Sequence, residues 1–263
     1  MSTLAFTLTD SATMLRRNVK HQIRYASVTI MLIGMPLVFL LLFVYVFGGQ
    51  LGTGLDGTHT GRSAYLAYVT PGILIMTVAS AALGTALSVA SDMTEGIVAR
   101  FRTMSISRGA VLTGHVLGTL IQTVLGLVVV GGVAVAIGFR SDAAALKWLA
   151  ALGILLLFGL ALTWLSTALG LAAKSVETAS NTPLFLTILP FLGSGFVPTD
   201  SMPTGMRQFA EYQPFTPVTE TVRKLLNGGA VGHSAMEAIA WSVGITIAAY
   251  LWSIHLYNNR PIR

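Results

Sequence analysis

The chain has 263 residues, of which 54% are hydrophobic and only 10% are charged, and its formal net charge is +6. Soluble domains carry roughly 25% charged residues, so too few solubilising side chains are present to cover a water-exposed globule of this length. The apolar content also excludes a disordered chain. Composition therefore indicates an integral membrane protein. The absence of cysteine excludes a disulfide framework, a thiol nucleophile and a cysteine metal site.

The first predicted element is an amphipathic helix over about 10–25, with Asp10 or Ser11 as its cap. Its apolar stripe consists of Ala12, Leu15, Val19 and Ile23. Its basic face consists of Arg16, Arg17, Lys20 and Arg24. Such a helix is expected to lie in the inner headgroup layer and to lead into the first span. The alternative is a solvated cytoplasmic tail.

Six windows free of Asp, Glu, Lys and Arg are long enough to cross a bilayer, which takes about 20 helical residues. They cover 25–55, 63–91, 109–139, 148–173, 178–199 and 238–259. A charge at the centre of a membrane helix costs about 2.5–3.5 kcal/mol, so six such windows are not expected by chance. The chain is therefore predicted to be an all-α membrane protein with six transmembrane helices in a single domain, 1–263. The first window is too long for a cleaved signal peptide, and we expect no processing.

The distribution of charge predicts the orientation. With the N-terminus inside, the inner segments hold ten basic and four acidic residues, whereas the outer segments hold six of each. The excess of Lys and Arg therefore places both termini in the cytoplasm. This excess accounts for the basic character of the chain without nucleic acid as a partner.

The loop between the second and third windows, 91–109, has the pattern of a short helix over about 92–104. Asp92 and Glu95 are spaced like a capping box, and Arg100 and Arg102 suit the end of a helix. An apolar stripe recurs at helical spacing, consisting of Met93, Ile97, Phe101 and Met104. These features favour an exposed helix that binds a protein partner. A helix that merely lies on lipid is the alternative.

The outer loop before the last window is long, and prolines divide it into two short pieces that together cover about 200–229. Its helical part is predicted to stop at Gly228. Its apolar content predicts burial against the spans or partial entry into the outer leaflet, where irregular backbone is tolerated only against protein or water.

Several kinds of chemistry are missing from the sequence. It contains no phosphate-binding Gly-rich loop of the Walker type and no His-Glu-x-x-His zinc motif. None of the six windows contains an acid, which weighs against a proton- or sodium-coupled carrier. His115 and His255, near the inner ends of their spans, are expected to be structural. Ser194 and His255 resemble a rhomboid-type serine protease pair only superficially, because Leu192 replaces the required glycine and the two residues lie near opposite ends of their spans.

Two stretches carry a family resemblance. Residues 92–109 read Asp-Met-Thr-Glu-Gly-Ile-Val-Ala-Arg-Phe-Arg-Thr-Met-Ser-Ile-Ser-Arg-Gly, and 196–203 read Phe-Val-Pro-Thr-Asp-Ser-Met-Pro. The second stretch continues as Phe-Ala-x-x-Gln-Pro-x-Thr-Pro over 209–217 and Leu-Leu-Asn-Gly over 225–228. Together with six spans, these motifs resemble the type-2 ABC exporter permeases, and most closely their daunorubicin-resistance-type branch. Ser105 stands where that branch usually has proline.

The resemblance implies a division of labour between subunits. The loop after the second span would be a coupling helix that docks on a separate ATPase subunit, and the helix before the first span would be the interfacial connecting helix. The outer loop would form a re-entrant helical hairpin. By this analogy the ATPase contact is made by Asp92, Glu95, Gly96, Ile97, Arg100, Phe101 and Arg102. The assembly would contain two permeases and two ATPases, with ATP and Mg bound on the ATPases and no cofactor on this chain.

The sequence thus predicts a permease of an ATP-driven exporter in the plasma membrane, with a hydrophobic drug, natural product or lipid as cargo. The expected path lies between two permease subunits, identical or paralogous, along the first, second and fifth spans. Candidate lining residues are Phe39, Phe43, Met76, Phe191 and Phe196. The alternatives are a six-span intramembrane enzyme of rhomboid-like type and an ATPase-independent carrier.

Overall fold

The structure, a computed structural model, describes residues 3–24, 26–54, 61–94 and 108–259. Every secondary-structure element in these ranges is helical. The first half of the chain forms α1 (Thr3–Arg24), α2 (Ala26–Leu42), η1 (Phe43–Phe47), α3 (Gly48–Leu51), η2 (Gly52–Gly54), α4 (Arg62–Thr94) and α6 (Arg108–Ala136). The second half forms α7 (Ala145–Ala172), α8 (Val176–Asn181), α9 (Leu184–Ile188), η3 (Leu189–Leu192), η4 (Thr199–Ser201), α10 (Thr204–Tyr212), α11 (Phe215–Asn227) and α12 (Gly232–Asn259).

Five stretches of helix in the described part of the chain are long and apolar enough to cross a membrane. They are Ser27–Leu51, Arg62–Thr94, Val111–Ala136, Ala145–Ala172 and Gly232–Tyr257. These five coincide with the first four predicted windows and the last one. The protein is therefore a multi-pass membrane protein, as its composition predicted.

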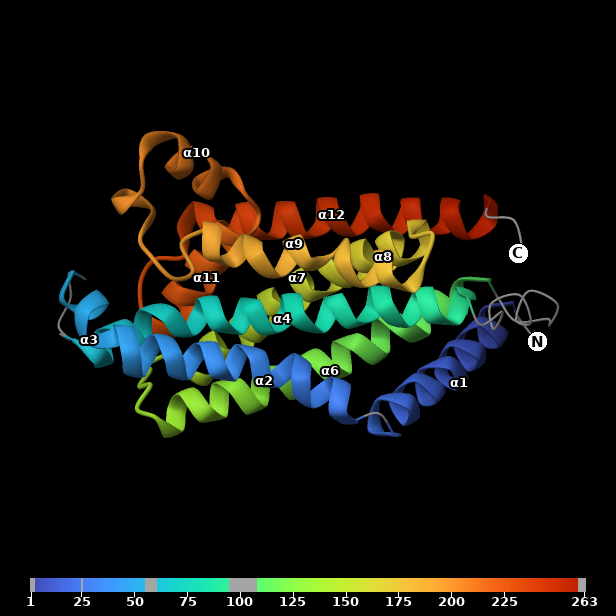
Figure 1. Cartoon of the computed structure of the whole chain (residues 1–263), viewed down its shortest axis with the longest axis horizontal. Coiled ribbons are helices and arrows are strands. Elements are labelled where there is room, and N and C mark those ends of the chain that lie inside the picture. The colour runs from blue at the N-terminus through green and yellow to red at the C-terminus, as the bar shows by residue number, and fades with distance from the viewer. Residues whose placement is uncertain (1–2, 25, 55–60, 95–107, 260–263) are drawn as a thin grey trace.

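The window 178–199 does not form the single helix expected of a span. It contains α8, α9 and η3, followed by turns up to Pro198. Pro183 and Pro190 account for the breaks, since proline lacks the N–H that a continuing helix needs. The pieces nevertheless follow one another along the bundle (Figure 1), where α8, α9 and η3 all contact α4.

The bundle has two distinct ends (Figure 1). We call the end at which α1 begins and α12 finishes the proximal end; α4 also ends there and α6 begins there. The opposite end, with α3, α10 and α11, is the distal end. α4 occupies the centre, because it contacts α2, α6, α7, α8, α9 and α11. Its middle turns, from Val69 to Ala82, are continuously buried.

A helix is present over the predicted N-terminal range as α1, which begins earlier, at Thr3. α1 lies against α6 and buries Met14. Arg17, expected on the basic face, turns toward α4 and pairs with Asp92 there. Ile23, from the predicted apolar stripe, is 72% exposed.

The predicted outer loop forms two helices of different character. α11 is inserted at the distal end, where it contacts α4, α7 and α12 and buries Phe215, Val218, Val222 and Leu226. It ends at Gly228, whose φ of 87° is a conformation that favours glycine, so the predicted stop is confirmed. α10 projects from the bundle (Figure 1), and within it only Ala210 is buried.

Candidate functional site

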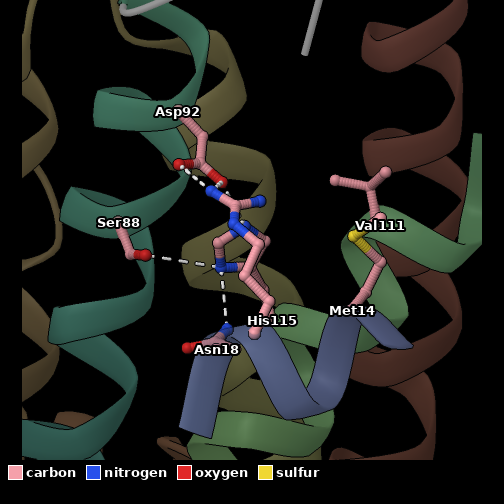
Figure 2. Close-up of a pocket in the computed structure, with 7 residues that line it drawn as sticks. Met14, Asn18, Ser88, Asp92, Val111 and His115 are labelled. Atoms are coloured by element: carbon pink, nitrogen blue, oxygen red, sulfur yellow. Dashed lines mark hydrogen bonds and ion pairs between the residues drawn. The ribbon is translucent and has the colours of Figure 1, made fainter. Parts of the chain in front are cut away.

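A cluster of polar side chains joins three helices at the proximal end (Figure 2). Asp92, in the last turn of α4, accepts from Nη2 of Arg17 at 2.9 and 3.0 Å. Its Oδ2 also lies 3.0 Å from Nε2 of His115, on α6. The side chains of His115 and Asp92 are only 9% and 12% exposed, whereas that of Arg17 is 39% exposed. We call these residues, with Asn18 and Ser88, the proximal cluster.

His115, on α6, contacts side chains of both α1 and α4. Nδ1 lies 3.0 Å from Nδ2 of Asn18 and 3.4 Å from the Ser88 hydroxyl. A carboxamide nitrogen donates, so this contact fits an Nδ1 that accepts and an Nε2–H that points at Asp92. Asp92 thus receives hydrogen bonds from both α1 and α6 and holds the end of α4 to them.

Two glycines allow α1 to approach α6 closely enough for this geometry. A Cβ at Gly114 would lie 2.6 Å from Cβ of Met14, and one at Gly118 would lie 3.0 Å from Cγ of Asn18. Small residues four apart are the usual means of close helix packing in membranes. The sequence pattern Gly114-x-x-x-Gly118 is the local signal for this contact.

The structure revises the role of Asp92. α4 continues through Thr94, so Asp92 lies in the last turn of this helix. Glu95, the other member of the predicted capping box, lies outside the described residues, so the capping box stays a prediction. Its carboxylate faces Arg17 and His115 inside the bundle. The remaining residues of the predicted ATPase contact lie outside the described residues; they are Glu95, Gly96, Ile97, Arg100, Phe101 and Arg102.

Four of the five predicted path residues meet in one aromatic cluster. The rings of Phe191 and Phe196 stack at 4.3 Å, and Phe43 lies 4.8 Å from Phe196. Phe39 contacts Phe191 edge-on at 5.2 Å. The cluster therefore joins α2 and η1 to the interrupted segment 178–199. The fifth residue, Met76, is 3% exposed and packs in the main apolar core from the middle of α4.

The interrupted segment is stabilised by side chains that the sequence analysis did not single out. Tyr65 donates to the carbonyl of Phe196 at 3.1 Å, and Tyr68 donates to that of Ser194 at 2.9 Å. Nη2 of Arg223, on α11, reaches the same Ser194 carbonyl at 2.6 Å. Irregular backbone inside a membrane protein needs such partners, because lipid offers none.

Close backbone contact complements these hydrogen bonds. A Cβ at Gly72 would lie 2.4 Å from the carbonyl oxygen of Gly195, so only glycine fits at this point of α4. The predictive signals were a glycine in the middle of an apolar helix and two tyrosines one turn apart, at 65 and 68.

The geometry gives no support to the protease alternative. Ser194 is buried beside Tyr68, near the start of α4 and hence toward the distal end. His255 lies in the last turns of α12, at the proximal end, and its ring contacts Asn259. The two residues are thus at opposite ends of the bundle, as the sequence indicated.

Comparison with known proteins identifies the family. The ABC-2 type transporter family model matches residues 10–227, and the chain belongs to this family. The chain is 30% identical over 227 residues to the daunorubicin resistance ABC transporter permease protein DrrB1 of Streptomyces coeruleorubidus. The matched region covers 86% of this chain and 78% of that relative. It is 24% identical over 162 residues to a probable doxorubicin resistance ABC transporter permease protein, DrrC, of Mycobacterium tuberculosis, covering 62% of this chain and 59% of that relative. The predicted resemblance is confirmed: the chain is an ABC-2 permease homologous to drug-resistance permeases.

Proposed function

We propose that this protein is the membrane-spanning subunit of an ATP-driven ABC exporter that moves a hydrophobic or amphipathic drug, natural product or lipid out of the cell. The observation that carries the proposal is the family match over 10–227 together with 30% identity to a daunorubicin resistance permease. The sequence has no Walker-type loop, so ATP and Mg are assigned to a separate ATPase subunit, present in two copies beside two permeases. The assembly belongs to the plasma membrane.

The proposed topology has six crossings with both termini in the cytoplasm. Ten basic residues occupy the segments 1–24, 92–108, 174–177 and 260–263, which connect or flank helices at the proximal end. The positive-inside rule therefore supports a cytoplasmic proximal end. We assign the fifth crossing to the interrupted segment 178–199, and the outer hairpin to α10 and α11 at the extracellular side. The hydrogen bonds from Tyr65, Tyr68 and Arg223 support an interrupted crossing, because they satisfy carbonyls that lipid would leave unpaired.

Coupling is assigned to the segment between α4 and α6. The sequence 95–107 links the last turn of α4 to the first turn of α6, so any motion of this segment acts on both helix ends at once. We propose that Glu95, Gly96, Ile97, Arg100, Phe101 and Arg102 form the docking surface for the ATPase. Asp92 is assigned to transmission of the motion, because its bonds to Arg17 and His115 connect α4 with α1 and α6.

The transport step is then a two-state switch. ATP binding closes the ATPase pair, moves the proximal helix ends as a unit and opens a path between the two permeases. The aromatic cluster of Phe39, Phe43, Phe191 and Phe196 lies where α2 meets the interrupted segment. Its rings offer the apolar, polarisable surface that suits amphipathic cargo. Met76 enters the path only if α4 moves, since it is buried here.

Co-purification with the ATPase tests the proposal. The variant Phe101→Asp is expected to lose a stoichiometric ATPase partner while the chain still inserts into the membrane. The control Phe209→Asp alters an exposed ring on α10, at the other end of the molecule, and is expected to retain the partner. If Phe101→Asp keeps the ATPase, the docking assignment is wrong. If the wild-type chain transports cargo alone, it is an ATPase-independent carrier.

A further inference from the structure

The distal half of α4 contains a proline, at position 71, within an otherwise continuous helix. Proline has no N–H, so the carbonyl of Ala67, four residues earlier, has no partner in the backbone of its own helix. A carbonyl without a partner is costly in a membrane protein, because lipid offers no donor. We call residues 66–71 the proline turn.

The missing hydrogen bond is replaced from α11. Nδ2 of Asn227 donates to the carbonyl of Ala67 at 2.8 Å. Asn227 is the last residue of α11, directly before Gly228, so the end of this helix fixes its position. A side-chain amide therefore takes the place of the backbone donor that Pro71 lacks.

The carbonyls on either side of Ala67 also accept hydrogen bonds from side chains. The hydroxyl of Thr70 donates to the carbonyl of Leu66 at 2.6 Å. Nε and Nη2 of Arg223 each lie 3.3 Å from the carbonyl oxygen of Tyr68. Threonine bonds of this kind weaken and bend helices, and proline is a usual cause of a kink. The geometry of the proline turn thus depends on side chains, and two of the three donors belong to α11.

The same part of α4 contacts the interrupted segment. Arg223 donates from Nη2 to the carbonyl of Ser194 at 2.6 Å, and its Cζ lies 3.9 Å from the centroid of the Tyr68 ring. Gly72, directly after the proline, packs on the backbone of Gly195. α4, α11 and the interrupted segment therefore meet at one place in the distal part of the bundle. A bend at the proline turn changes their contacts together.

We infer that Asn227 is a positioning residue for transport. Its bond to the carbonyl of Ala67 keeps the proline turn, and with it the distal end, in the closed arrangement seen here. When this bond is released, α4 bends at Pro71 and separates from the interrupted segment. The inference rests on the proposed function, for which it names the point at which the extracellular side opens. Asn227 suits a releasable contact, because it is exposed and can exchange this bond for one with water.

The absence of cysteine in the sequence permits a direct measurement of opening. Ser194→Cys places a single thiol inside the contact. Ser194 is 2% exposed and its hydroxyl has no hydrogen-bond partner among the described residues, so the change is nearly isosteric and removes no side-chain bond. The full chain is placed in lipid nanodiscs, and the reaction of the thiol with a charged, membrane-impermeant maleimide is followed. The thiol is expected to react only when the interrupted segment separates from α4.

Asn227→Ala in this background is expected to raise the reaction rate roughly three- to tenfold, the range that corresponds to the loss of one hydrogen bond between membrane helices. Asn227→Asp keeps the size of the side chain but replaces the donor with an acceptor, and it is expected to raise the rate at least as much. Asn181→Ala, at an exposed position on α8, is the matched control and is expected to leave the rate unchanged.

A substitution of the proline separates this role from a general loss of stability. Pro71→Ala restores an N–H four residues after Ala67, so α4 itself supplies the donor. In the Pro71→Ala background, Asn227→Ala is therefore expected to change the reaction rate by less than about twofold. A residue that only stabilised the fold would have the same effect in both backgrounds.

The outcomes are distinct. Faster reaction of the Asn227→Ala and Asn227→Asp chains, abolished by Pro71→Ala, supports the inference. An unchanged rate in both Asn227 variants, or an equal effect of Asn227→Ala in both backgrounds, overturns it.

These measurements contain no ATPase, so a further arm tests the proposed function separately. Addition of the ATPase subunit with a non-hydrolysable ATP analogue is expected to accelerate the reaction of the Ser194→Cys chain. If the nucleotide has no effect while the proline-dependent effect of Asn227 remains, the exporter function is refuted and the role of Asn227 in closing the distal end is supported.

Discussion

The close approach of α1 to α6 at Gly114 gives the sharpest prediction. Gly114→Ala introduces a Cβ that would lie 2.6 Å from Cβ of Met14 and 3.1 Å from its backbone carbonyl carbon. Neither atom is the end of a flexible side chain, so a rotamer change does not relieve the clash. Carbon atoms in contact are ordinarily about 3.5–4.0 Å apart, so α1 must move away from α6 by about 1 Å.

The displacement has a calculable effect on the proximal cluster. A shift of α1 by about 1 Å away from α6 lengthens the Asn18–His115 separation, now 3.0 Å, beyond the hydrogen-bonding range. It also weakens the Arg17–Asp92 pair, now at 2.9 Å, because the Arg17 side chain must stretch to keep it. Overpacking of this kind costs about 1–3 kcal/mol. Hydrogen bonds between membrane helices are worth about 0.6–1.7 kcal/mol each. We therefore expect a loss of about 2–4 kcal/mol in the free energy of unfolding.

The measurement is reversible unfolding in mixed detergent micelles, followed by tryptophan fluorescence. Gly132→Ala is the matched control, because it lies on the same helix and its Cβ would meet nothing within 4 Å. Asp92→Asn, combined with Gly114→Ala, completes a double-mutant cycle. The two changes should be less than additive, because the glycine substitution already weakens the ion pair. Equal stability of the Gly114→Ala and Gly132→Ala variants, or strict additivity in the cycle, would refute this reasoning.

Two further predictions concern the contact between the interrupted segment 178–199 and α4. Gly72→Ala should destabilise the protein by about 1–3 kcal/mol, because its Cβ would meet the rigid backbone of Gly195 at 2.4 Å. Gly84→Ala is the control, since the nearest neighbour of its Cβ would be the end of a flexible leucine side chain at 3.0 Å. Equal losses of stability in the two variants would argue against close packing of Gly72 on Gly195. Tyr68→Phe removes one hydrogen-bond donor to the Ser194 carbonyl and should lower the free energy of unfolding, measured in the same micelles, by about 1 kcal/mol. An unchanged free energy of unfolding would show that this hydrogen bond does not stabilise the interrupted segment.

The hydrophobic pattern of the sequence predicted the long helices well. Five of the six windows coincide with helices long enough to cross a membrane, because an apolar run free of charge has few alternatives to a membrane helix. The window 178–199 is also apolar, yet it breaks at Pro183 and Pro190. A composition count does not register such breaks, which depend on whether neighbouring side chains compensate the lost backbone bonds.

The candidate site was predicted only in part. The four aromatic path residues were chosen from their chemistry, and the structure brings Phe39, Phe43, Phe191 and Phe196 together from distant parts of the chain. Arg17 was assigned to a basic surface, since helical periodicity places it beside Arg16 and Lys20. The periodicity carries no information about Asp92, which is 75 residues away in the sequence.

The sequence by itself determined that this protein is an integral membrane protein. It also determined the approximate positions of the long helices and the family of the chain. These properties follow from local composition and from short motifs, which the chain carries wherever it folds. Tertiary structure alone decided that α1 docks on α6, that a buried carboxylate joins three helices and that a broken segment is held by two tyrosines and an arginine. Such features arise from contacts between residues far apart in the chain, and their energies exist only once the helices have packed.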